Sequence, residues 1–600
     1  MRGIMQTAAA ETKNADKSAT KSALAGIDKD KVASRRPVPR EIVVGAEDLM
    51  LERVLRWEKE RAGELYMIQP LGGGEVREYT WKDTVGEARR LAAWIESLGY
   101  PPGSRIAFLT KNCAHFMIFD LAVWMAGHVS VPLYPTVTAD TVRYVLEHSE
   151  ARLLFAGKLD EWDKQASGVP EGVRVLVCAL SPESAKSKPG ADVWEKVIER
   201  EPMGGEPVRP GSDIATIIYT SGSTGVPKGV VHDFQGIAAA VKGAARDFGI
   251  TAQDRTISYL PLAHAFERTV IETCSFVVGF RVYFAESLDT FVADVRRARP
   301  TVFHSVPRLW LKFQEGVHKK MPPGRLSFLL KIPIVKGVIR KKVLTGLGLE
   351  QARAAITGSA PIPADLIRWY HALGVELCEG YAMSENFSYS HFSRPGDSKP
   401  GTVGLPAPDV DVKLGDDGEV LVKSPANMVG YYKQPEATDE TFTADGYVRT
   451  GDRGIIDPDG RLRIVGRTKE LFKTSKGKYI APAPIESELQ GTGLVELACV
   501  TGNGLPQPVA IVSPNEAIRM KASTHEGRAE VEAELVGLLD RINGTLPAHE
   551  RLDRLYVTAE AWTIDNQLLT PTMKIRRSAI DERYGSKIGE EGPKLVWLES

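Results

Sequence analysis

The chain has 600 residues, 43% of them apolar and 26% charged, which is the composition of an ordinary globular protein and excludes a disordered or fibrous one. At about 150 residues per folding unit, this length predicts roughly four units. A net charge of −1 gives no indication of nucleic-acid binding, and five scattered cysteines without a C-x-x-C pair argue against a disulfide framework or a zinc site.

Residues 1–40 are rich in Ala, Lys, Ser and Asp and contain no aromatic residue. We expect them to form a disordered N-terminal extension, because such a composition cannot bury an apolar core. They lack the apolar stretch of a signal peptide, and their acidic residues argue against a transit peptide. The chain has no uncharged apolar run of about 18 residues, so no membrane-spanning helix is predicted and we expect a cytoplasmic protein.

From Glu47 onward, helical apolar patterns alternate with short β-branched runs, which is typical of the α/β class. Residues 141–150 ("TVRYVLEHSE") place their apolar side chains on one face of a helix. Residues 419–424 and 461–466 are predicted strands, each close to a glycine-containing turn.

A loop rich in glycine and hydroxyl groups, "TSGSTGVPKG", spans residues 220–229. The β-branched run 213–219 before it predicts a buried strand, and the Ala-rich run 233–249 after it predicts a helix. We therefore expect a loop that joins a strand to a helix and whose N–H groups and hydroxyls converge on a phosphate. It is not a Walker A loop, because proline precedes and glycine follows Lys228. Taken alone, it could equally be a flexible turn.

The loop resembles the phosphate loop of the adenylate-forming enzymes, which include acyl-CoA synthetases, luciferases and the adenylation domains of peptide synthetases. Five more motifs of that family follow in order: "GSAPIP" (358–363), "EGYAMSEN" (379–386), "YVRTGDRG" (447–454), "GRTKELFKTSKGKYIAPAPIE" (466–486) and "LLTPTMKIRR" (568–577). The resemblance covers residues 47–585, and six ordered motifs are far more specific than any one of them.

The resemblance implies an α/β fold with two domains. The larger, at residues 41–466, would contain two α/β sheets and a distorted β-barrel. The smaller, at residues 467–600, would be a mobile α+β domain.

In the reaction that the resemblance implies, a carboxylate attacks the α-phosphate of ATP and gives an acyl-AMP and pyrophosphate. A thiol, usually that of coenzyme A, then displaces AMP. The loop would hold the β- and γ-phosphates, and Thr220 is in addition a candidate metal ligand. The implied phosphate-binding residues of the loop are Thr220, Ser221, Gly222, Ser223, Thr224, Gly225 and Lys228.

"EGYAMSEN" resembles the family's adenine and metal motif. Tyr381 would flank the adenine, and Ser384 would contact the α-phosphate at a position where the family usually has threonine. Glu385 would bind Mg²⁺, which prefers carboxylate and phosphate oxygens, although a solvated surface acid is the alternative. Ala382 replaces the usual glycine, and its methyl group could narrow the entrance for the acyl chain.

Two more motifs would complete the nucleotide site. Asp452 would accept both hydroxyls of the ribose diol, which suits a carboxylate with two oxygens, whereas a salt bridge to Arg453 is the alternative. Arg467 would make a second contact to the ribose or a phosphate. The backbone would approach the nucleotide base at Gly358, Ser359 and Ala360.

The last motifs supply lysines. Lys574 would bridge the substrate carboxylate and the α-phosphate and neutralise charge that builds on both in the transition state, and a solvated basic run is its alternative. Lys469 matches the hinge about which the small domain rotates between the two half-reactions. Lys476 and Gly477 would approach coenzyme A after that rotation, although a solvated turn has the same composition.

The identity of the acid is less sharply defined. "PLAHAFER" (261–268) is similar to the motif of long-chain fatty acyl-CoA synthetases and would place His264 near the carboxylate, with a structural histidine as the alternative. No acidic residue that would bind a substrate amino group is evident. The leading hypothesis is therefore an ATP- and Mg²⁺-dependent fatty acyl-CoA ligase.

Two other functions remain open. In the first, adenylation is kept and the acceptor is an acyl carrier protein or a hydroxy acid. In the second, the chain is a non-catalytic scaffold that binds nucleotide or lipid, which the intact Glu385, Asp452, Arg467 and Lys574 argue against.

Residues 325–348 carry six basic residues, no acid and many Leu, Ile and Val. They could lie peripherally on the inner, anionic face of a membrane, where lipid substrates partition. An ordinary basic surface helix, interrupted at Pro333, is the slightly favoured interpretation. The sequence does not fix the oligomeric state, for which a homodimer is one option.

Overall fold

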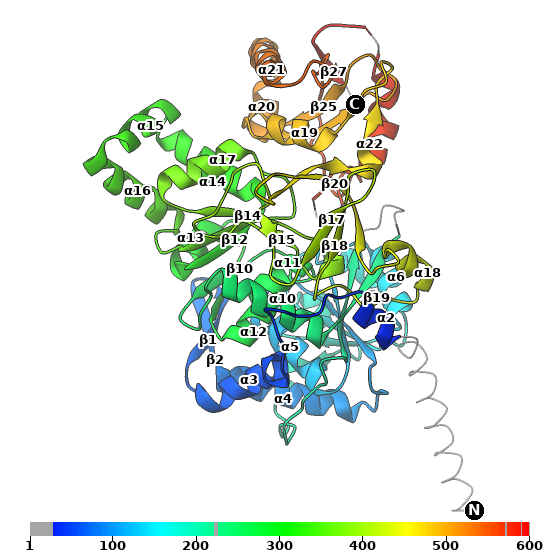
Figure 1. The fold of residues 1–600 in the computed structure, drawn as a ribbon. Helices are drawn as coiled ribbons and strands as arrows, with labels where there is room; N and C mark the ends of the chain where they lie inside the picture. Colours follow the sequence, from blue (N-terminus) through cyan, green and yellow to red (C-terminus); the bar gives the residue numbers. More distant parts are fainter. Residues whose placement is uncertain (1–27, 221–225, 571–572, 590, 599–600) are drawn as a thin grey trace, which may run out of the picture.

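The computed structural model describes residues 28–220, 226–570, 573–589 and 591–598. Figure 1 shows the C-terminal residues, coloured orange to red, as a smaller lobe on one side of a larger body. Among the described residues, an eight-stranded sheet, three smaller sheets and the C-terminal sheet account for most strands. The predicted α/β class, with a large N-terminal and a smaller C-terminal part, is confirmed.

The eight-stranded sheet has the order β19-β9-β8-β4-β3-β5-β6-β7. Its central strands β3, β4 and β5 are parallel and buried along their whole length, as expected for apolar strands in a sheet with covered faces. The strands are β3 (Arg105–Leu109), β4 (Val129–Leu133), β5 (Leu153–Ala156), β6 (Arg174–Val177), β7 (Asp192–Val193), β8 (Ile214–Thr220), β9 (Lys228–Asp233) and β19 (Gly430–Tyr431).

Helices accompany this sheet, and α5 is buried at every residue. The predicted helix at 141–150 is confirmed as α6, whose inward face is apolar. The helices are α4 (Trp81–Ser97), α5 (Ala114–Met125), α6 (Ala139–Ser149), α7 (Trp162–Gln165), α8 (Glu183–Lys186), α9 (Trp194–Val197) and α10 (Phe234–Asp247), with a 3₁₀ turn η2 (Ala166–Gly168).

The prediction that the glycine-rich loop joins a strand to a helix is wrong. The loop joins β8 to β9, which are antiparallel neighbours, and Thr220 pairs with Lys228 across its base. Helix α10 begins only at Phe234, where the Asp233 side chain accepts a hydrogen bond from the Gly236 N–H at 2.8 Å. The β-branched pair Val230–Val231 forms a strand because β8 and β19 flank it on both sides.

Two further sheets complete the core of the body, with orders β10-β11-β1-β2 and β12-β13-β14-β15-β16. Strands β12, β13 and β14 are parallel, so their carboxyl ends, at Ser305, Thr357 and Tyr381, meet at one edge. The strands are β1 (Leu65–Gly72), β2 (Glu75–Thr80), β10 (Arg255–Ser258), β11 (Arg281–Phe284), β12 (Val302–Ser305), β13 (Ala354–Thr357), β14 (Leu377–Tyr381), β15 (His391–Phe392) and β16 (Leu405–Pro406).

The helices and turns associated with these two sheets include one long excursion between β12 and β13. They are 3₁₀ turn η1 (Ala46–Asp48), α3 (Met50–Glu60), α11 (Ala265–Glu267), the π-helical turn η3 (Arg268–Thr273), α12 (Cys274–Val278), α13 (Phe291–Ala298), α14 (Pro307–Lys320), α15 (Pro323–Lys331), α16 (Pro333–Leu347), α17 (Ala364–Leu373) and 3₁₀ turn η4 (Ser384–Asn386).

An antiparallel sheet of order β17-β18-β20-β21 lies between the body and the C-terminal lobe. Both strands predicted in this region are confirmed, as β18 and β21. The elements are β17 (Asp411–Leu414), β18 (Glu419–Lys423), α18 (Pro435–Thr441), β20 (Val448–Ile456) and β21 (Leu462–Arg467).

The C-terminal lobe has its own apolar core, in which residues of α19 and α21 pack on its sheet. That sheet has the order β24-β25-β26-β27. The elements are η5 (Thr468–Glu470), β22 (Phe472–Lys473), β23 (Tyr479–Ile480), α19 (Pro482–Gln490), β24 (Val495–Thr501), β25 (Val509–Pro514), α20 (Glu516–Lys521), α21 (His525–Thr545), β26 (Leu555–Thr558), α22 (Arg577–Tyr584), η6 (Gly585–Lys587) and β27 (Leu595–Leu598).

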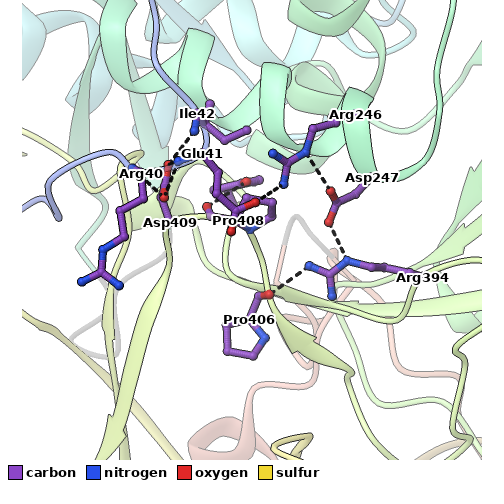
Figure 2. A network of polar contacts seen from close by, with 10 residues as sticks. Arg40, Glu41, Ile42, Arg246, Asp247, Arg394, Pro406, Pro408 and Asp409 are labelled. Atoms are coloured by element: carbon purple, nitrogen blue, oxygen red, sulfur yellow. Dashed lines mark hydrogen bonds and ion pairs between the residues drawn. The ribbon is translucent and has the colours of Figure 1, made fainter.

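The expectation of disorder over residues 1–40 is wrong for residues 28–40, and residues 1–27 lie outside the described part. Helix α2 (Lys29–Ser34) is followed by an extended segment, residues 35–42, which we call the N-terminal strap. The Asp409 carboxylate accepts hydrogen bonds from the N–H groups of Arg40, Glu41 and Ile42 at 2.7–3.1 Å (Figure 2).

Polar contacts also hold the first residues of the strap. The Arg36 guanidinium donates to the Asn427 carbonyl oxygen at 2.7 Å and to the Asp233 carboxylate at 2.9 Å. Disorder was predicted for this segment because it contains few apolar residues. The structure orders the strap through these polar contacts instead, which do not require an apolar core.

Candidate active site

The base of the glycine-rich loop lies beside the predicted metal acid. The Lys228 ammonium is 4.8 Å from the centre of the Tyr431 ring, and the Tyr431 hydroxyl donates to Oε1 of Glu385 at 2.7 Å. Tyr431 reaches this position because β19 pairs with β9. Thr220 pairs with Lys228 across the base of the loop, so three predicted site residues, Thr220, Lys228 and Glu385, lie in one region of the structure. Sequence reasoning missed Tyr431, which connects them.

Ser221, Gly222, Ser223, Thr224 and Gly225 lie outside the described residues.

The segment that carries Ser384 and Glu385 is fixed through its backbone. The His232 ring nitrogen Nε2 donates to the Ser384 carbonyl oxygen at 2.7 Å, and the Met428 N–H donates to the Glu385 carbonyl oxygen at 2.7 Å. Burial lowers the pKa of His232 to about 4, so its ring is neutral near pH 7. Sequence reasoning missed His232, and its place in the strand directly after the loop was the available signal.

Asp452 has both carboxylate oxygens in contact with predicted site residues. The Tyr381 hydroxyl donates to Oδ2 at 2.6 Å, and Nε of Arg467 lies 3.2 Å from Oδ1. Asp452 and Arg467 are opposite each other in the β20–β21 ladder, which explains why they meet. The salt-bridge partner of Asp452 is thus Arg467 rather than Arg453, and each oxygen keeps a second lone pair for a ligand hydroxyl.

Lys574 belongs to the C-terminal lobe and sits on a tight turn. Its N–H donates to the Thr570 hydroxyl at 3.1 Å, and the preceding Met573 has a φ of 61°. The residue is exposed to solvent, and the protein atoms around its ammonium disfavour the charged form and lower its pKa.

The charges around Lys574 come from both parts of the chain. Desolvation is the largest cause of the lowered pKa of Lys574, and the positive charge of Arg467 is the second. The negative charges of Asp452, Glu470 and Glu385 act in the opposite direction and raise this pKa. The lysine of the last motif therefore lies within electrostatic reach of the predicted ribose acid and the predicted metal acid.

His264 lies near the same lysine. Its Nδ1 accepts a hydrogen bond from the Phe266 N–H at 3.0 Å at the start of α11, so the proton of the neutral ring is on Nε2. Burial, together with the positive charge of Lys574, lowers the pKa of His264 to about 4. His264 is therefore a neutral hydrogen-bond donor near pH 7 rather than a cation.

The "GSA" segment follows β13 at the sheet edge where β14 ends with Tyr381. Ser359 has a φ of 70°, a left-handed conformation that is uncommon for a residue with a side chain. A Cβ at Gly358 would meet the Gly380 carbonyl oxygen at 3.4 Å and the Phe266 ring at 3.7 Å, which are ordinary contacts. Ser359 and Ala360 are exposed, so this edge is open to a ligand.

The remaining predicted residues lie in the C-terminal lobe or at its border. Lys469 is in the turn η5, directly after β21. Lys476 and Gly477 form the exposed tip of the β22–β23 hairpin, where Gly477 has a φ of 77°.

The residues fit a hard, oxygen-binding metal. Among the described residues, no group of three His, Cys, Asp or Glu side chains could hold a metal ion. Mg²⁺ is commonly bound by one or two carboxylates together with substrate phosphates, and the Glu385 carboxylate and the Thr220 hydroxyl are oxygen donors of the kind that it prefers.

A polar cleft with a volume of about 750 Å³ lies elsewhere, beneath the N-terminal strap and around Arg246, Arg394 and Tyr447. None of its lining residues belongs to the predicted site. The volume of a cleft is therefore not sufficient to identify the candidate active site.

Comparison with known proteins identifies the class. Residues 55–432 match the model of the AMP-binding enzyme family, and residues 470–591 match that of the AMP-binding enzyme C-terminal domain. The chain belongs to the AMP-binding enzyme family, that is, to the adenylate-forming enzymes that its motifs resemble.

Named relatives cover nearly the whole chain. The chain is 30% identical to the long-chain-fatty-acid–CoA ligase FadD15 of Mycobacterium tuberculosis in an alignment that covers 92% of this chain and 98% of the relative. It is 30% identical to the peroxisomal long chain acyl-CoA synthetase 6 of Arabidopsis thaliana over 86% of this chain and 82% of the relative.

Solved structures show the same fold. An anthranilate CoA ligase, AuaEII, in complex with anthranoyl-AMP superposes with a TM-score of 0.72 over 91% of this chain and 100% of that one, at 20% identity. The adenylation domain of a carboxylate reductase from Mycobacterium chelonae gives a TM-score of 0.75 over 96% of each chain, also at 20% identity.

Proposed function

We propose that the protein activates a long-chain fatty acid with ATP and transfers the acyl group to coenzyme A. A carboxylate oxygen of the acid forms a bond to the α-phosphorus of ATP, and the bond from that phosphorus to the leaving pyrophosphate breaks. The thiolate of coenzyme A then bonds to the acyl carbon, the bond to the phosphate oxygen breaks, and AMP leaves. The thiol proton passes to solvent.

One observation carries this proposal. Lys574, from the C-terminal lobe, lies within electrostatic reach of Asp452, Glu385 and His264, which come from three separate segments of the body. A cation among a diol-binding acid, a metal-binding acid and a neutral donor is what the transfer of a carboxylate to a nucleotide phosphate requires. The names of the relatives at 30% identity support a long-chain fatty acid as substrate.

In the first half-reaction, the ammonium of Lys574 would neutralise the charge shared by the carboxylate and the α-phosphate. Nε2–H of His264 would donate to the substrate carboxylate and hold it in line. Ser384 would contact the α-phosphate. Mg²⁺ bound by Glu385 and Thr220 would offset the charge on the phosphates.

The nucleotide would be held by the remaining predicted residues. Asp452 would accept the ribose hydroxyls, with Arg467 beside it, and Tyr381 would flank the adenine. The loop from Thr220 to Lys228 would hold the terminal phosphates, and Gly358, Ser359 and Ala360 would line the base.

The second half-reaction would use another arrangement of the two domains. We place the domain border between residues 466 and 467 and the pivot at Lys469, in the turn η5 that joins the two parts. Rotation would remove Lys574 from the candidate active site and bring the hairpin tip with Lys476 and Gly477 toward coenzyme A. We further propose a cytoplasmic protein, peripheral on the inner face of the membrane, and a homodimer as the oligomeric state.

The reaction is tested by pyrophosphate release from ATP and Mg²⁺ with acids from acetate to stearate, each with and without coenzyme A. We expect coenzyme A-dependent turnover that is highest with the long-chain acids. Acid-dependent pyrophosphate release without formation of acyl-CoA would show an acceptor other than coenzyme A, such as an acyl carrier protein or a hydroxy acid. Absence of release with every acid would contradict the proposal.

A further inference from the structure

The excursion between β12 and β13 carries a concentrated positive charge. Residues 316–349, which we call the basic arm, comprise the end of α14 together with α15 and α16, and they contain no acidic residue. Among the described residues, none of its lysines or arginines forms a salt bridge. Its eight basic residues are Lys319, Lys320, Arg325, Lys331, Lys336, Arg340, Lys341 and Lys342.

This charge is unusual for the chain as a whole, in which Lys and Arg number 76 and Asp and Glu 77. The charges of such a balanced chain are normally interspersed and paired. In the basic arm the positive charges are neither interspersed with negative charges nor paired with them. The arm therefore presents only positive charge to its surroundings.

The basic arm also exposes large apolar side chains. Phe328 is 65% exposed, Ile334 88% and Val338 65%. The same two helices bury Leu326, Val343 and Leu347 in the core of the body, so the arm is a packed part of the fold. Figure 1 shows α15 and α16 projecting from the body, which leaves their outer side uncovered.

The exposed residues of α16 share one face. Ile334, Val338, Lys341 and Lys342 are spaced i, i+4, i+7 and i+8, which places them along one stripe of a helix. The buried Val343 and Leu347 lie on the opposite side. The outer stripe therefore combines apolar side chains at its start with lysines toward its end.

We propose that the basic arm docks on the surface of an anionic lipid bilayer. Lysines attract an anionic surface electrostatically, and projecting Phe, Ile and Val side chains gain free energy by entering the boundary between headgroups and acyl chains. A nucleic acid would be attracted by the lysines but would leave these apolar side chains without a favourable environment. Within the part of the chain that the structure describes, no helix is long and apolar enough to cross a bilayer, so the contact lies on the surface.

The position of the arm links docking to the candidate active site. Helix α14 begins at Pro307, two residues after β12 ends at Ser305, on the sheet edge that also carries Gly358 and Tyr381. The 14 residues of α14, about 21 Å in length, separate this edge from the start of α15. If the proposed function holds, docking keeps the edge within about that distance of the phase in which long-chain acids dissolve. The docking itself is independent of that function.

The test is co-sedimentation of the full-length protein with vesicles of phosphatidylcholine containing 30% phosphatidylglycerol, compared with vesicles of phosphatidylcholine alone. We expect binding only to the anionic vesicles, and weaker binding at high salt. Each lysine near the surface contributes about fivefold in affinity, so the double variant Lys341→Glu/Lys342→Glu is expected to lose at least about 25-fold. The double variant Ile334→Ser/Val338→Ser is expected to weaken binding as well.

Matched controls separate docking from general surface effects. The variant Lys82→Glu/Lys196→Glu makes the same change of charge at exposed lysines of α4 and α9, and Met520→Ser removes an apolar side chain that is 69% exposed on α20. Both controls are expected to bind like the unaltered protein. The arm variants are expected to keep the pyrophosphate release measured with octanoate, a water-soluble acid, which shows that they fold.

Three results would overturn the proposal: no binding of the unaltered protein to anionic vesicles, equal loss in the control variants, or binding that the serine variant does not weaken. Binding to single- or double-stranded DNA that depends on Lys341 and Lys342 but not on Ile334 and Val338 would show a nucleic-acid surface instead. Failure of the proposed function appears separately, as absence of pyrophosphate release with octanoate and with every other acid, while vesicle binding persists.

Discussion

The Tyr431 hydroxyl donates a hydrogen bond of 2.7 Å to the Glu385 carboxylate, while the ring of the same tyrosine faces the Lys228 ammonium at 4.8 Å. One aromatic side chain thus sets the orientation of the proposed metal ligand and touches the base of the proposed phosphate loop. Its position depends on the pairing of β19 with β9, so the geometry of the site is built into the edge of the large sheet.

Replacement of Tyr431 by phenylalanine should weaken the use of Mg²⁺. The ring stays, but Glu385 loses the donor that orients it, and loss of such a partner typically costs about 10- to 100-fold in metal affinity or activity. The measurement is the Mg²⁺ concentration that gives half-maximal pyrophosphate release. Tyr447→Phe is the matched control, because its hydroxyl also donates to a carboxylate at 2.7 Å, that of Asp411, outside the site. An equal effect of both variants would contradict the role given to Tyr431.

Replacement of Lys574 by alanine should abolish most of the adenylation activity. Loss of a donor that stabilises charge in a transition state typically lowers kcat by about 10²- to 10³-fold. The measurement is single-turnover pyrophosphate release, compared with the conversion of prepared acyl-AMP and coenzyme A to acyl-CoA, which should be affected far less. Arg576→Ala, two residues away and exposed, is the control. If Arg576→Ala were as damaging, the effect would come from the basic run as a whole.

Four buried histidines should each lower the stability of the protein on acidification between about pH 6.5 and 4. Burial lowers the pKa of His115 and His391 to about 3 and of His128 and His232 to about 4, whereas an unfolded histidine titrates near 6.5. In this range these histidines bind protons in the unfolded chain but not in the native one, so their contribution to the free energy of unfolding rises with pH and falls on acidification. Buried carboxyls such as Glu379, whose pKa burial raises to about 8, act in the opposite sense. Urea unfolding at pH 7 and pH 5 measures the difference.

The variant His115→Phe isolates one of these groups. His115 packs edge-on against Tyr79 and Trp194, and a phenylalanine keeps an aromatic ring there without a titrating nitrogen. We expect a smaller loss of stability between pH 7 and pH 5 than in the unaltered protein. His549→Gln, at a position where the side chain is 42% exposed, should leave the loss unchanged. A full loss in His115→Phe would exclude this histidine as a contributor.

Replacement of Asp409 by alanine should release the N-terminal strap. The carboxylate accepts from three consecutive N–H groups, and a hydrogen bond to a charged group contributes about 1.5–3 kcal/mol, so we expect the free energy of unfolding to fall by at least this amount. Asp409→Asn keeps an acceptor and tolerates the left-handed backbone, φ 59°, so its effect should be smaller. Proteolysis at residues 35–42 reports the release directly, with Asp416→Ala at an exposed position as control. Unchanged protection in Asp409→Ala would show that the other contacts of the strap, those of Arg35, Arg36 and Glu41, are sufficient to hold it.

The sequence was informative where a function depends on a short motif. Asp452 and Arg467 were both predicted in the nucleotide site, and they do form an ion pair, because one motif lies on β20 and the next begins at the end of its neighbour β21. Tyr431 and His232 could not be predicted in this way. Their contacts with residues 384 and 385 arise from strand pairing and packing between segments about 50 to 150 residues apart, which no local pattern records.

The two errors have one physical origin. The hairpin β8–β9 was taken for a strand followed by a helix, because a short β-branched run such as Val230–Val231 does not show whether strands flank it on both sides. The strap was taken for a disordered segment, because its order comes from single charged contacts to Asp233, Asn427 and Asp409. In both cases the decisive partner is remote in the sequence.

The strap has a consequence for how the chain folds during synthesis. Ile42 and Asp409, which it joins, are separated by 367 residues. At about 5–20 residues per second, a ribosome needs roughly 20–70 s to make the second after the first. Throughout that interval the strap of the nascent chain lacks its partner. The strap can therefore dock only after Asp409 has been made, by which time the parallel strands β3, β4 and β5 of the large sheet have long been synthesised.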